Sequence, residues 1–362
     1  MSIAGNLTLT LVIDAGRVTA VEIGSTRPRA ARLLAGKTAA AALQLLPLLF
    51  TVCGTAQRLA GEAAVAAAQG QVIPANPADR LALLCETTQE HLWRLLLDWP
   101  HMLGQEQLQA EFAMWFRRLG LAGKSGCWPD WGDTFSDFVA TAIVGMRLDV
   151  WAHLTNFAPP GDGQSLAGNI WRALPDTPAQ DRGGWLPRSP VAVFADALGT
   201  VWSDAFELAP EWQGAAAETG PLARWRNHPA LTAALRRYGR SARTRVLALL
   251  MDLEQCACNI AAGADSAAAA TIDACVVAPG VGVARVETAR GTLLHRVRLE
   301  DKRVAEYTLV APTEWNFHPR GAFVSTLLGA LAVDLESLRH QAAVLALALD
   351  PCVPFQIEIE HA

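Results

Sequence analysis

The chain has 362 residues, of which 51% are hydrophobic and 18% are charged. This composition provides enough apolar sequence for one large or two ordinary hydrophobic cores. The 30 lysine and arginine residues and the 35 aspartate and glutamate residues give a net charge of −5, which excludes the strongly basic balance typical of nucleic-acid-binding proteins. We therefore expect a globular protein without a nucleic-acid partner.

Three features of the sequence bear on where the protein resides. The first residues lack the positive segment that opens a signal peptide, and the seven cysteines are odd in number and scattered, which argues against a disulfide framework. Residues 38–57 carry no formal charge and are about as long as a membrane span, but Pro47 and several polar residues favour a buried segment. We expect a cytoplasmic protein with reduced cysteines and no membrane insertion.

The first predicted elements are a β-hairpin and a set of helices. Apolar residues alternate through residues 7–23 around a turn at 14–17, which predicts a hairpin. Residues 30–69 are rich in alanine and leucine, which favours helix, with interruptions near Pro47 and around Cys53. Cys53 is therefore expected near a helix end.

The middle of the chain begins as helix and then differs from both ends. Apolar residues in 80–120 recur at helical spacing, which predicts two packed helices separated at residues 100–104. Eleven of the twelve tryptophans lie between residues 93 and 225. Glycine and proline cluster within 158–190, which predicts a long irregular insertion. We interpret residues 100–280 as a divergent, tryptophan-rich region whose aromatic residues form either core or a partner surface.

The C-terminal part of the chain combines helices with a second β unit. Residues 228–262 have a helical pattern, and residues 276–310 are rich in β-branched residues with a turn at 300–303, which predicts another hairpin. A last helix is expected over residues 324–349, with a break near its glycine. Pro351 should prevent the helix from continuing.

The sequence lacks the motifs of several common enzyme classes. It contains no phosphate-binding GxxxxGK[ST] loop, no HExxH metalloprotease helix and no GxSxG nucleophile elbow. Cys256 and Cys258 form a CxC pair, but residues two apart on a helix point to different faces and cannot easily bind one ion. We expect one core thiol and one surface thiol at these positions.

Short segments near both ends resemble the large-subunit superfamily of nickel–iron hydrogenases. Three N-terminal segments are similar to its RIEGHL, RxCGxC and HFY motifs, namely residues 2–7 (SIAGNL), 46–60 (LPLLFTVCGTAQRLA) and 91–93 (HLW). Three C-terminal segments are similar to EAPRGxLxH, VVPTTWNxxPR and DPCxxC, namely residues 287–295 (ETARGTLLH), 310–320 (VAPTEWNFHPR) and 350–352 (DPC). The resemblance covers the two ends of the chain and little of its middle.

Departures from these motifs bear on activity. In the family's enzymes each CxxC binds nickel and bridges it to iron, and the second cysteines are replaced here by Ala56 and Phe355. Neither side chain can ligate a metal. The family's proton-relay glutamate is Ala4, and two family histidines are Asn6 and Glu358. The resemblance therefore implies no nickel and no hydrogenase catalysis.

The retained residues imply a pocket for an iron unit with cyanide and carbonyl ligands. By the resemblance, Cys53 and Cys352 are thiolate ligands of iron. Arg290 and Thr313 are placed where the family holds two cyanides, with Pro312 beside Thr313 in the same cofactor-binding set. Soft thiolates suit a low-spin iron, and a guanidinium and a hydroxyl suit the cyanide nitrogens.

Each of these residues also has a purely structural interpretation. Cys53 could be a buried thiol at a helix end, and Cys352 a loop thiol. Arg290 could be a surface arginine of a strand, and Thr313 a turn hydroxyl. By the same resemblance, His295 is expected to pack or hydrogen-bond near the site, and Asn316 to bridge backbone segments.

The resemblance also implies a fold. We expect a helix-dominated α+β protein, with a large-subunit-like helical bundle, an N-terminal hairpin and a C-terminal β unit. Residues 1–362 would form a single large-subunit-like domain, in which residues 1–60 and 284–362 form the two halves of the metal site.

Two functions from different classes follow. The first is the role proposed for HupK/HoxV-type proteins, a non-catalytic scaffold that transiently binds or assembles the Fe(CN)2CO unit before transfer to the hydrogenase large subunit. Its partners would be HypC/HypD-type accessory proteins and the large-subunit precursor. The second is a metal-free pseudo-enzyme that binds the accessory proteins as an adaptor. An active hydrogenase would require other cysteines to replace the missing ligands, namely Cys85, Cys127, Cys256, Cys258 or Cys275.

Overall fold

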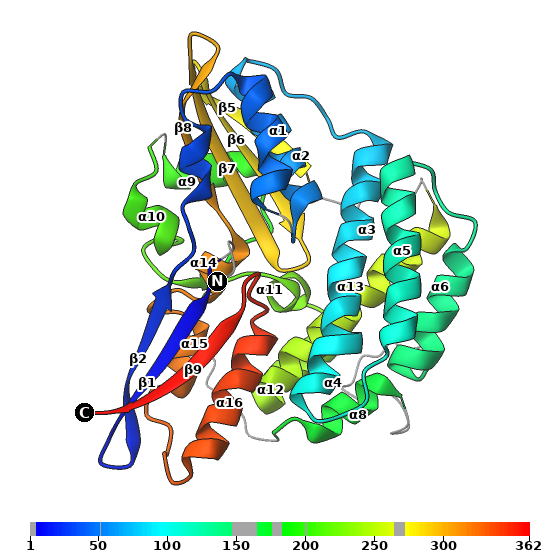
Figure 1. Ribbon diagram of the computed structural model, residues 1–362, viewed down its shortest axis with the longest axis vertical. Coiled ribbons are helices and arrows are strands. Elements are labelled where there is room, and N and C mark those ends of the chain that lie inside the picture. Colours follow the sequence, from blue (N-terminus) through cyan, green and yellow to red (C-terminus); the bar gives the residue numbers. More distant parts are fainter. Residues whose placement is uncertain (1–4, 51, 147–164, 176–182, 200, 264–271) are drawn as a thin grey trace. The chain divides into compact units, whose positions relative to one another are not determined.

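The computed structural model describes residues 5–50, 52–146, 165–175, 183–199, 201–263 and 272–362 (Figure 1). The chain forms two compact units. Unit 1 comprises Met1–Pro74, Arg182–Gly220 and Thr271–Ala362, and unit 2 comprises Ala75–Asp181 and Pro221–Ala270. Much of the irregular insertion expected within 158–190 lies outside the described residues. The predicted helix-rich α+β fold is confirmed.

A three-stranded sheet joins the two ends of the chain in unit 1. The predicted hairpin is confirmed as β1 (Leu7–Asp14) and β2 (Arg17–Ser25), which pair antiparallel. The apolar residues that alternate along β1 are buried, because one face of the sheet covers a core. The last strand, β9 (Phe355–His361), was not predicted; it pairs in parallel with β1 and gives the order β2-β1-β9.

Two C-terminal helices pack against this sheet. The helix expected over residues 324–349 is broken into α15 (Ala322–Leu327) and α16 (Leu335–Ala348), as the sequence indicated. Gly329 has a positive φ of 83° and its N–H donates to the carbonyl of Val18. The chain leaves the helical path there because this backbone bond ties it to β2.

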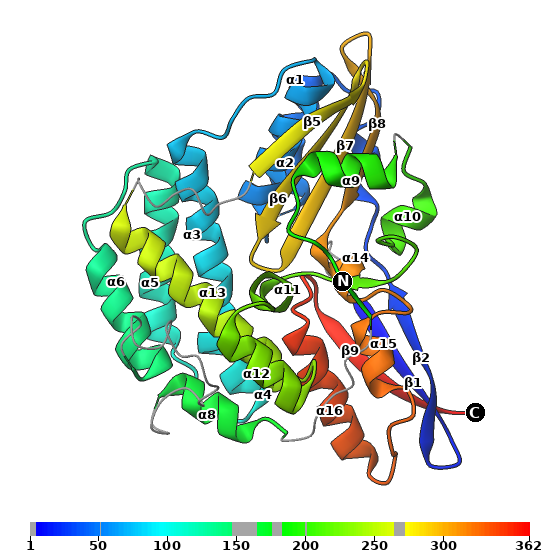
Figure 2. The ribbon, with the colours of Figure 1, turned by 180° about the vertical axis from the view of Figure 1, so that it is seen from behind.

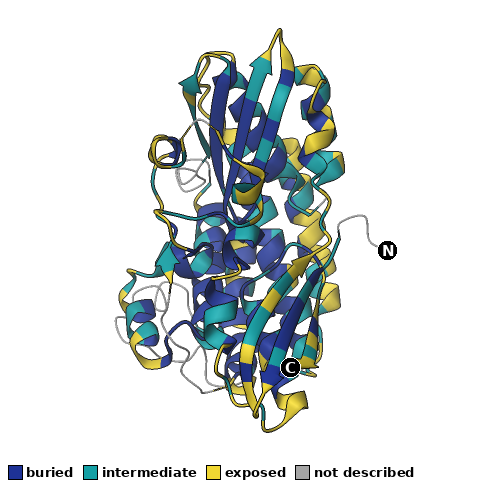
Figure 3. Ribbon diagram, turned by 90° about the vertical axis from the view of Figure 1, so that its left-hand side faces the viewer, coloured by how far each residue is buried: buried dark blue, intermediate teal, exposed yellow. Residues whose placement is uncertain are grey.

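The second sheet of unit 1 is an antiparallel meander. Its strands follow the chain in the order β5-β6-β7-β8, and they are β5 (Ile272–Ala278), β6 (Val281–Thr288), β7 (Gly291–Glu300) and β8 (Arg303–Val310). The predicted β region and its turn at 300–303 are confirmed. Helix α2 (Gly54–Ala68) contacts β5, β6 and β7, and α9 (Val191–Leu198) contacts β5 and β6. Figures 1 and 2 show α2 and α9 on opposite faces. The central strands β6 and β7 are therefore mostly buried (Figure 3).

The close fit of α2 on the sheet depends on small residues. A Cβ atom at Gly282 of β6 would lie 2.2 Å from the carbonyl oxygen of Ala64 and 2.4 Å from the nitrogen of Ala68. Both atoms belong to the backbone of α2 and cannot move aside. The alanine-rich sequence of α2 and this glycine together bring the helix, and Cys53 at its start, close to the strands.

The helical region before α2 departs from one expectation. The interruption around Cys53 is confirmed, since α1 (Ala39–Leu49) ends before it and α2 begins after it. The interruption predicted near Pro47 is wrong, because α1 continues through this residue to Leu49. Proline removes a single backbone donor. The helical hydrogen bonds continue beyond it, since the N–H of Phe50 donates to the carbonyl of Leu46 at 3.1 Å.

Shorter elements complete unit 1. A two-stranded parallel sheet connects residues near 184 and 217. The remaining elements are η1 (Ala30–Leu34), β3 (Gly184–Trp185), α10 (Asp204–Leu208), β4 (Ala217–Glu218) and α14 (Pro312–Asn316).

All the regular elements that the structure describes in unit 2 are helices. Its elements are α3 (Pro77–Trp93), η2 (Arg94–Asp98), α4 (Trp99–Met102), α5 (Gln109–Ser125), α6 (Gly132–Phe138), η3 (Val139–Val144), α8 (Leu166–Ala173), α11 (Pro221–Trp225), α12 (Pro229–Tyr238) and α13 (Ala242–Ala262). The two packed helices predicted within residues 80–120 are confirmed, since α3 and α5 contact each other and the chain between them leaves the helix within the predicted residues 100–104. Pro100 itself lies in the first turn of α4, where a proline is tolerated. The chain leaves the helix only at Leu103 and Gly104.

A buried carboxylate ties together the helices of unit 2. Asp252 of α13 accepts a hydrogen bond from His91 Nε2 at 2.8 Å and another from Trp225 Nε1 at 2.7 Å, and forms an ion pair with Arg224. Burial disfavours the charge, but Arg224 and His91 outweigh it and hold the pKa of Asp252 well below its usual range. In the next turn of α13, Cys256 is buried, as predicted for a core thiol, whereas Cys258 is half-buried rather than on the surface.

Two general expectations can be compared with the structure. None of the seven cysteines, all of which lie in the described ranges, pairs with another. Across the described ranges, no helix combines the length and the apolar character needed to cross a membrane. The uncharged stretch 38–57 is divided between α1 and α2.

Candidate functional site

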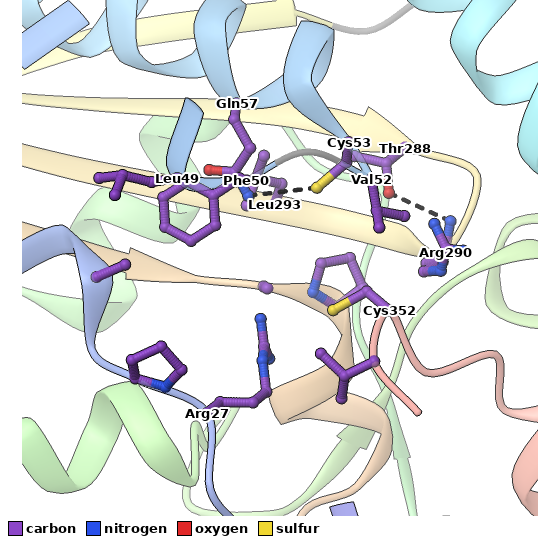
Figure 4. A pocket seen from close by; sticks show the side chains of 15 residues that line it. Arg27, Leu49, Phe50, Val52, Cys53, Gln57, Thr288, Arg290, Leu293 and Cys352 are labelled. Carbon is purple, nitrogen blue, oxygen red and sulfur yellow. Dashed lines mark hydrogen bonds between the residues drawn. The ribbon is translucent and has the colours of Figure 1, made fainter. Parts of the chain in front are cut away.

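A cavity of about 80 Å³ in unit 1 brings together segments from both ends of the chain (Figure 4). The loop after β2, the junction of α1 and α2, the β6–β7 turn, the start of α14 and the segment after α16 all contribute. The lining residues are Arg27, Pro28, Ala30, Leu49, Phe50, Val52, Cys53, Gln57, Thr288, Arg290, Leu293, Ala311, Pro312, Cys352 and Val353. Cys53 and Cys352, 299 residues apart in sequence, therefore share one cavity, together with the predicted residues Arg290 and Pro312.

Cys53 occupies the N-cap position of α2. Its sulfur faces the cavity (Figure 4) and lies 3.5 Å from the amide nitrogen Nε2 of Gln57, one turn further along the helix. The partial positive charge at the start of a 15-residue helix favours negative charge at this position. The expected helix-end location of Cys53 is confirmed, and the thiol is half-buried at a cavity wall.

Cys352 is held by Thr313. The hydroxyl Oγ1 of Thr313 donates to the sulfur of Cys352 at 3.1 Å, and the N–H of Cys352 donates to the same oxygen at 3.2 Å. Thr313 is buried but does not line the cavity. Its one O–H donor is directed to the sulfur, and its predicted contact with a cyanide stays a prediction.

Arg290 is buried, so the alternative of a surface arginine is wrong. Its Nε lies 3.2 Å from the carboxylate of Asp350, two residues before Cys352. The turn that carries it is fixed by Thr288, whose hydroxyl accepts the N–H of Arg290 at 3.2 Å and donates to the carbonyl of Gly291 at 2.9 Å. The guanidinium therefore approaches the cavity in a defined position.

Arg27 is a second cationic residue of the cavity, and the sequence did not indicate it. Its guanidinium points toward the space between the two sulfurs (Figure 4) and forms an ion pair with Glu314. Burial disfavours its charge, but Glu314 and the two sulfurs, that of Cys352 first, outweigh burial and raise the pKa of Arg27 above its ordinary value. The cavity thus presents two guanidinium groups and two thiols.

Gly5, in the opening motif, allows the backbone of Arg27 to approach closely. A Cβ atom at Gly5 would lie 2.6 Å from the Cα atom of Arg27, and Gly5 has a positive φ of 77°. The neighbouring Asn6 exchanges two hydrogen bonds with Thr26, one from its own N–H to the threonine hydroxyl and one from the N–H of Thr26 to its carbonyl. The glycine that matches the family's opening motif was the one available signal for this residue.

The two expected supporting residues are in place. His295 is buried and hydrogen-bonds near the site, to Gln57 at 2.9 Å and to the hydroxyl of Tyr307 at 2.7 Å. Burial lowers the pKa of His295 to about 3. Asn316 bridges backbone segments as predicted, because its Oδ1 accepts the N–H of Thr219 and its Nδ2 donates to the carbonyl of Leu349.

The protein supplies few metal ligands to this cavity. In the part of the chain that the structure describes, no group of three or more histidine, cysteine, aspartate or glutamate side chains is arranged to hold a metal ion. Two thiols at a cavity wall leave coordination positions on a bound metal for further ligands of its own.

Known proteins resemble the chain in sequence and in fold. The Nickel-dependent hydrogenase family matches residues 226–331. The fold is similar to that of the Ni-Fe-Se hydrogenase from Desulfovibrio vulgaris Hildenborough, with a TM-score of 0.64 and 16% identity over 94% of each chain. It is also similar to the reduced, active Ni-Fe-Se hydrogenase from Desulfomicrobium baculatum, with a TM-score of 0.61 and 14% identity over 94% of this chain and 95% of that one.

Curated relatives match along almost the whole chain. The hydrogenase expression/formation protein HoxV of Cupriavidus necator is 30% identical, over 93% of this chain and 92% of its own length. The hydrogenase expression/formation protein HupK of Azotobacter vinelandii is 32% identical, over 99% of this chain and 100% of its own. The chain therefore belongs to the HoxV/HupK family of hydrogenase expression/formation proteins.

Proposed function

We propose that this protein is a scaffold of hydrogenase maturation, which transiently binds an Fe(CN)2CO unit at Cys53 and Cys352 before the unit passes to a nickel–iron hydrogenase large subunit. The names of its relatives, hydrogenase expression/formation proteins, support the maturation role. In this proposal the iron unit is a cargo and the protein performs no hydrogenase catalysis.

The observation that carries the proposal is the convergence of the two cysteines in one cavity. Thiolates are the protein ligands preferred by soft, low-spin iron centres. Arg27 and Arg290 lie in the same lining and supply N–H donors for cyanide nitrogens, which bear negative charge. Each guanidinium has five N–H donors, so one group can contact both its carboxylate partner and a cyanide.

The size and polarity of the cavity suit this cargo. A single water molecule requires roughly 10–15 Å³ of cavity volume. A cavity of about 80 Å³ therefore has room for roughly five to eight atoms or groups of the size of a water molecule. The iron atom with one carbonyl and two cyanides has seven non-hydrogen atoms, each comparable to or smaller than a water. Apolar side chains of Phe50, Leu293 and Val353 form much of the wall, and they can accept a carbonyl ligand without a hydrogen-bond partner.

Charge also favours this cargo. An iron(II) ion with two cyanides and two thiolates carries a net charge of 2−, which is costly in a largely buried cavity unless cations are near. Arg27 and Arg290 place two positive charges in the cavity lining, and the carboxylates that pair with them, Glu314 and Asp350, do not line the cavity. We infer that this arrangement accepts the anionic unit without making the site strongly cationic when it is empty.

The incomplete ligand set supports release. Ala56 and Phe355 stand where the hydrogenase motifs have their second cysteines, so the site keeps two of the four thiolates that hold the two-metal centre in the family's enzymes. A metal with fewer protein ligands is bound less tightly and exchanges more readily. In this proposal HypC/HypD-type proteins deliver the unit, and the large-subunit precursor, with its full set of thiolates, receives it.

Infrared spectroscopy tests the cargo directly. The protein is isolated anaerobically from its native host, beside the variants Cys53→Ala and Cys352→Ala, with Cys127→Ala at an exposed cysteine as the matched control. Cyanide and carbonyl bands in the wild type and in the control, lost in both site variants, are the expected result. Wild-type protein without bands that still copurifies with the accessory proteins would overturn the scaffold role and favour a metal-free adaptor.

A further inference from the structure

A chain of buried hydrogen bonds runs from the sulfur of Cys53 to the interior of the four-stranded sheet. The amide nitrogen Nε2 of Gln57 donates to this sulfur at 3.5 Å, and the amide oxygen of Gln57 lies 2.9 Å from Nε2 of His295. The other ring nitrogen, Nδ1, lies 2.7 Å from the hydroxyl of Tyr307. Gln57, His295 and Tyr307 are all buried, at 1%, 0% and 6% exposure.

The direction of every hydrogen bond in this chain follows from the contact of Gln57 with the sulfur and from the neutral state of His295. Because the amide nitrogen of Gln57 faces the sulfur, its oxygen faces His295 and requires a proton on the ring nitrogen Nε2. A neutral histidine then has no proton on Nδ1 and accepts there from the hydroxyl of Tyr307. Burial keeps the ring neutral, since the pKa of His295 is lowered to about 3. Tyrosine thus donates to histidine, histidine to glutamine, and glutamine to the sulfur.

The fold makes specific room for this chain. A Cβ atom at Gly61 of α2 would lie 2.9 Å from the hydroxyl oxygen of Tyr307 and 2.2 Å from a methyl carbon of Leu46. A larger residue at Gly61 would therefore displace the hydroxyl that begins the chain. Three apolar side chains could fill the same space at less desolvation cost, so this buried polar arrangement requires a reason beyond packing.

We propose that Gln57, His295 and Tyr307 form a positioning chain that fixes an N–H donor on the sulfur of Cys53. The sulfur of Cys352 receives its donor from the hydroxyl of Thr313, a rotor that can turn away. The two thiolates are thus unequal: Cys53 keeps its donor and gives less electron density to a bound metal, whereas Cys352 can lose its donor. The inference rests on the proposed role of Cys53 as a metal ligand.

Cobalt(II) alone is the first probe, because its thiolate charge-transfer absorption reports the energy of the sulfur lone pairs. The full-length metal-free protein is titrated with cobalt(II) beside Gln57→Met, which keeps the length of the side chain and removes the donor. Gln69→Met, at the exposed C-cap of the same helix, is the matched control. A shift of the band to longer wavelength in Gln57→Met and none in Gln69→Met is expected. An unshifted band in Gln57→Met overturns the inference.

A second variant separates positioning from folding. Tyr307→Phe leaves Gln57 in place but removes the hydroxyl that fixes the proton of His295 on Nε2. The amide of Gln57 is then free to turn its oxygen toward the sulfur, so the cobalt band is expected to shift in the same direction, by a smaller amount. Thermal unfolding of each variant shows whether it is folded. A folded Tyr307→Phe protein with wild-type absorption would contradict a chain that begins at the tyrosine.

The infrared spectrum distinguishes this inference from the proposed function. With the iron unit bound, loss of the donor at Cys53 makes the sulfur a stronger donor, and the carbonyl band of Gln57→Met is expected at lower wavenumber than that of the wild type. Unchanged bands in Gln57→Met would refute the positioning chain and leave the cargo intact. Bands missing from the wild type, together with a cobalt shift in Gln57→Met, would refute the cargo and leave the chain standing.

Discussion

Thr313 and Cys352 are joined by hydrogen bonds in both directions. The threonine hydroxyl donates to the cysteine sulfur at 3.1 Å and accepts from the cysteine N–H at 3.2 Å. These bonds connect the start of α14 with the segment that follows α16, so a single hydroxyl contacts both the backbone N–H and the sulfur of Cys352.

This pair leads to a first prediction. Thr313→Val keeps the shape of the side chain and removes both hydrogen bonds, so the free energy of unfolding should fall by about 1–2 kcal/mol. Thr313→Ser keeps the hydroxyl and should lose less. Urea unfolding of the three proteins measures the difference. A valine variant as stable as the wild type would show that the hydroxyl does not hold Cys352 in solution.

Arg27 offers a way to separate stability from cargo binding. Arg27→Met leaves the carboxylate of Glu314 largely buried without its cation, which should lower the free energy of unfolding by about 2 kcal/mol. The double variant Arg27→Met, Glu314→Gln removes both charges and should recover most of this loss. If Arg27 holds the cyanides, the cyanide and carbonyl bands of the wild type are lost in both the single and the double variant.

An exposed ion pair is the control for Arg27. Arg32 pairs with Asp204 where both side chains are more than half exposed, so Arg32→Met should change the free energy of unfolding by less than about 1 kcal/mol and leave the cargo bands unchanged. Full cargo bands in the Arg27→Met, Glu314→Gln protein would show that the guanidinium of Arg27 serves the fold alone.

The contact between α2 and the four-stranded sheet gives a prediction about the fold. Gly282→Ala would place a methyl group 2.2 Å from backbone of α2, and the helix would have to move. We expect a loss of about 3 kcal/mol in the free energy of unfolding. Gly24→Ala, on β2, is the control, because its Cβ would meet its nearest neighbours at 3.6 Å. Equal stability of the two variants would contradict the close packing of α2.

The sequence predicted elements whose signals are local. The hairpin of β1 and β2 and the meander of β5 to β8 follow from alternation and turn residues within short stretches. Strand β9 has the same alternation at Phe355, Ile357 and Ile359, but its partner β1 lies almost a whole chain length away, and no local rule specifies a parallel pairing at that distance. Pro47 is expected to break a helix by the same local rules, but α1 continues through it to Leu49.

The site residues likewise fall into those that the sequence indicated and those that it did not. Cys53, Cys352, Arg290 and Pro312 were identified by resemblance, and the structure places them around one cavity. Arg27 lies between a strand and a 3₁₀ turn, where charged residues follow no period, and only its contact with Gly5 reveals how it is positioned. Gln57 appears in sequence as an ordinary polar residue of a helix. Its role depends on His295 and Tyr307, which come from strands more than 200 residues later.

The buried histidine makes stability depend on pH. The pKa of His295 is about 3 in the folded protein, against 6.5 for an ordinary histidine, so the unfolded chain binds the extra proton between these values. Its contribution to stability is complete above pH 6.5 and is lost as the pH falls toward 3. Between pH 7 and pH 5, uptake of this proton by the unfolded chain should lower the free energy of unfolding by about 2 kcal/mol.

His295→Gln cannot bind this proton, so the fall in its free energy of unfolding between pH 7 and pH 5 should be smaller by that amount. Urea unfolding of both proteins at the two pH values, compared as differences within each protein, removes the constant cost of the substitution. The buried His318, whose pKa is also lowered, contributes equally to both proteins and cancels. The same pH dependence in the variant and the wild type would mean that His295 takes up its proton in the folded state, where both ring nitrogens would donate and the bond with Tyr307 would reverse.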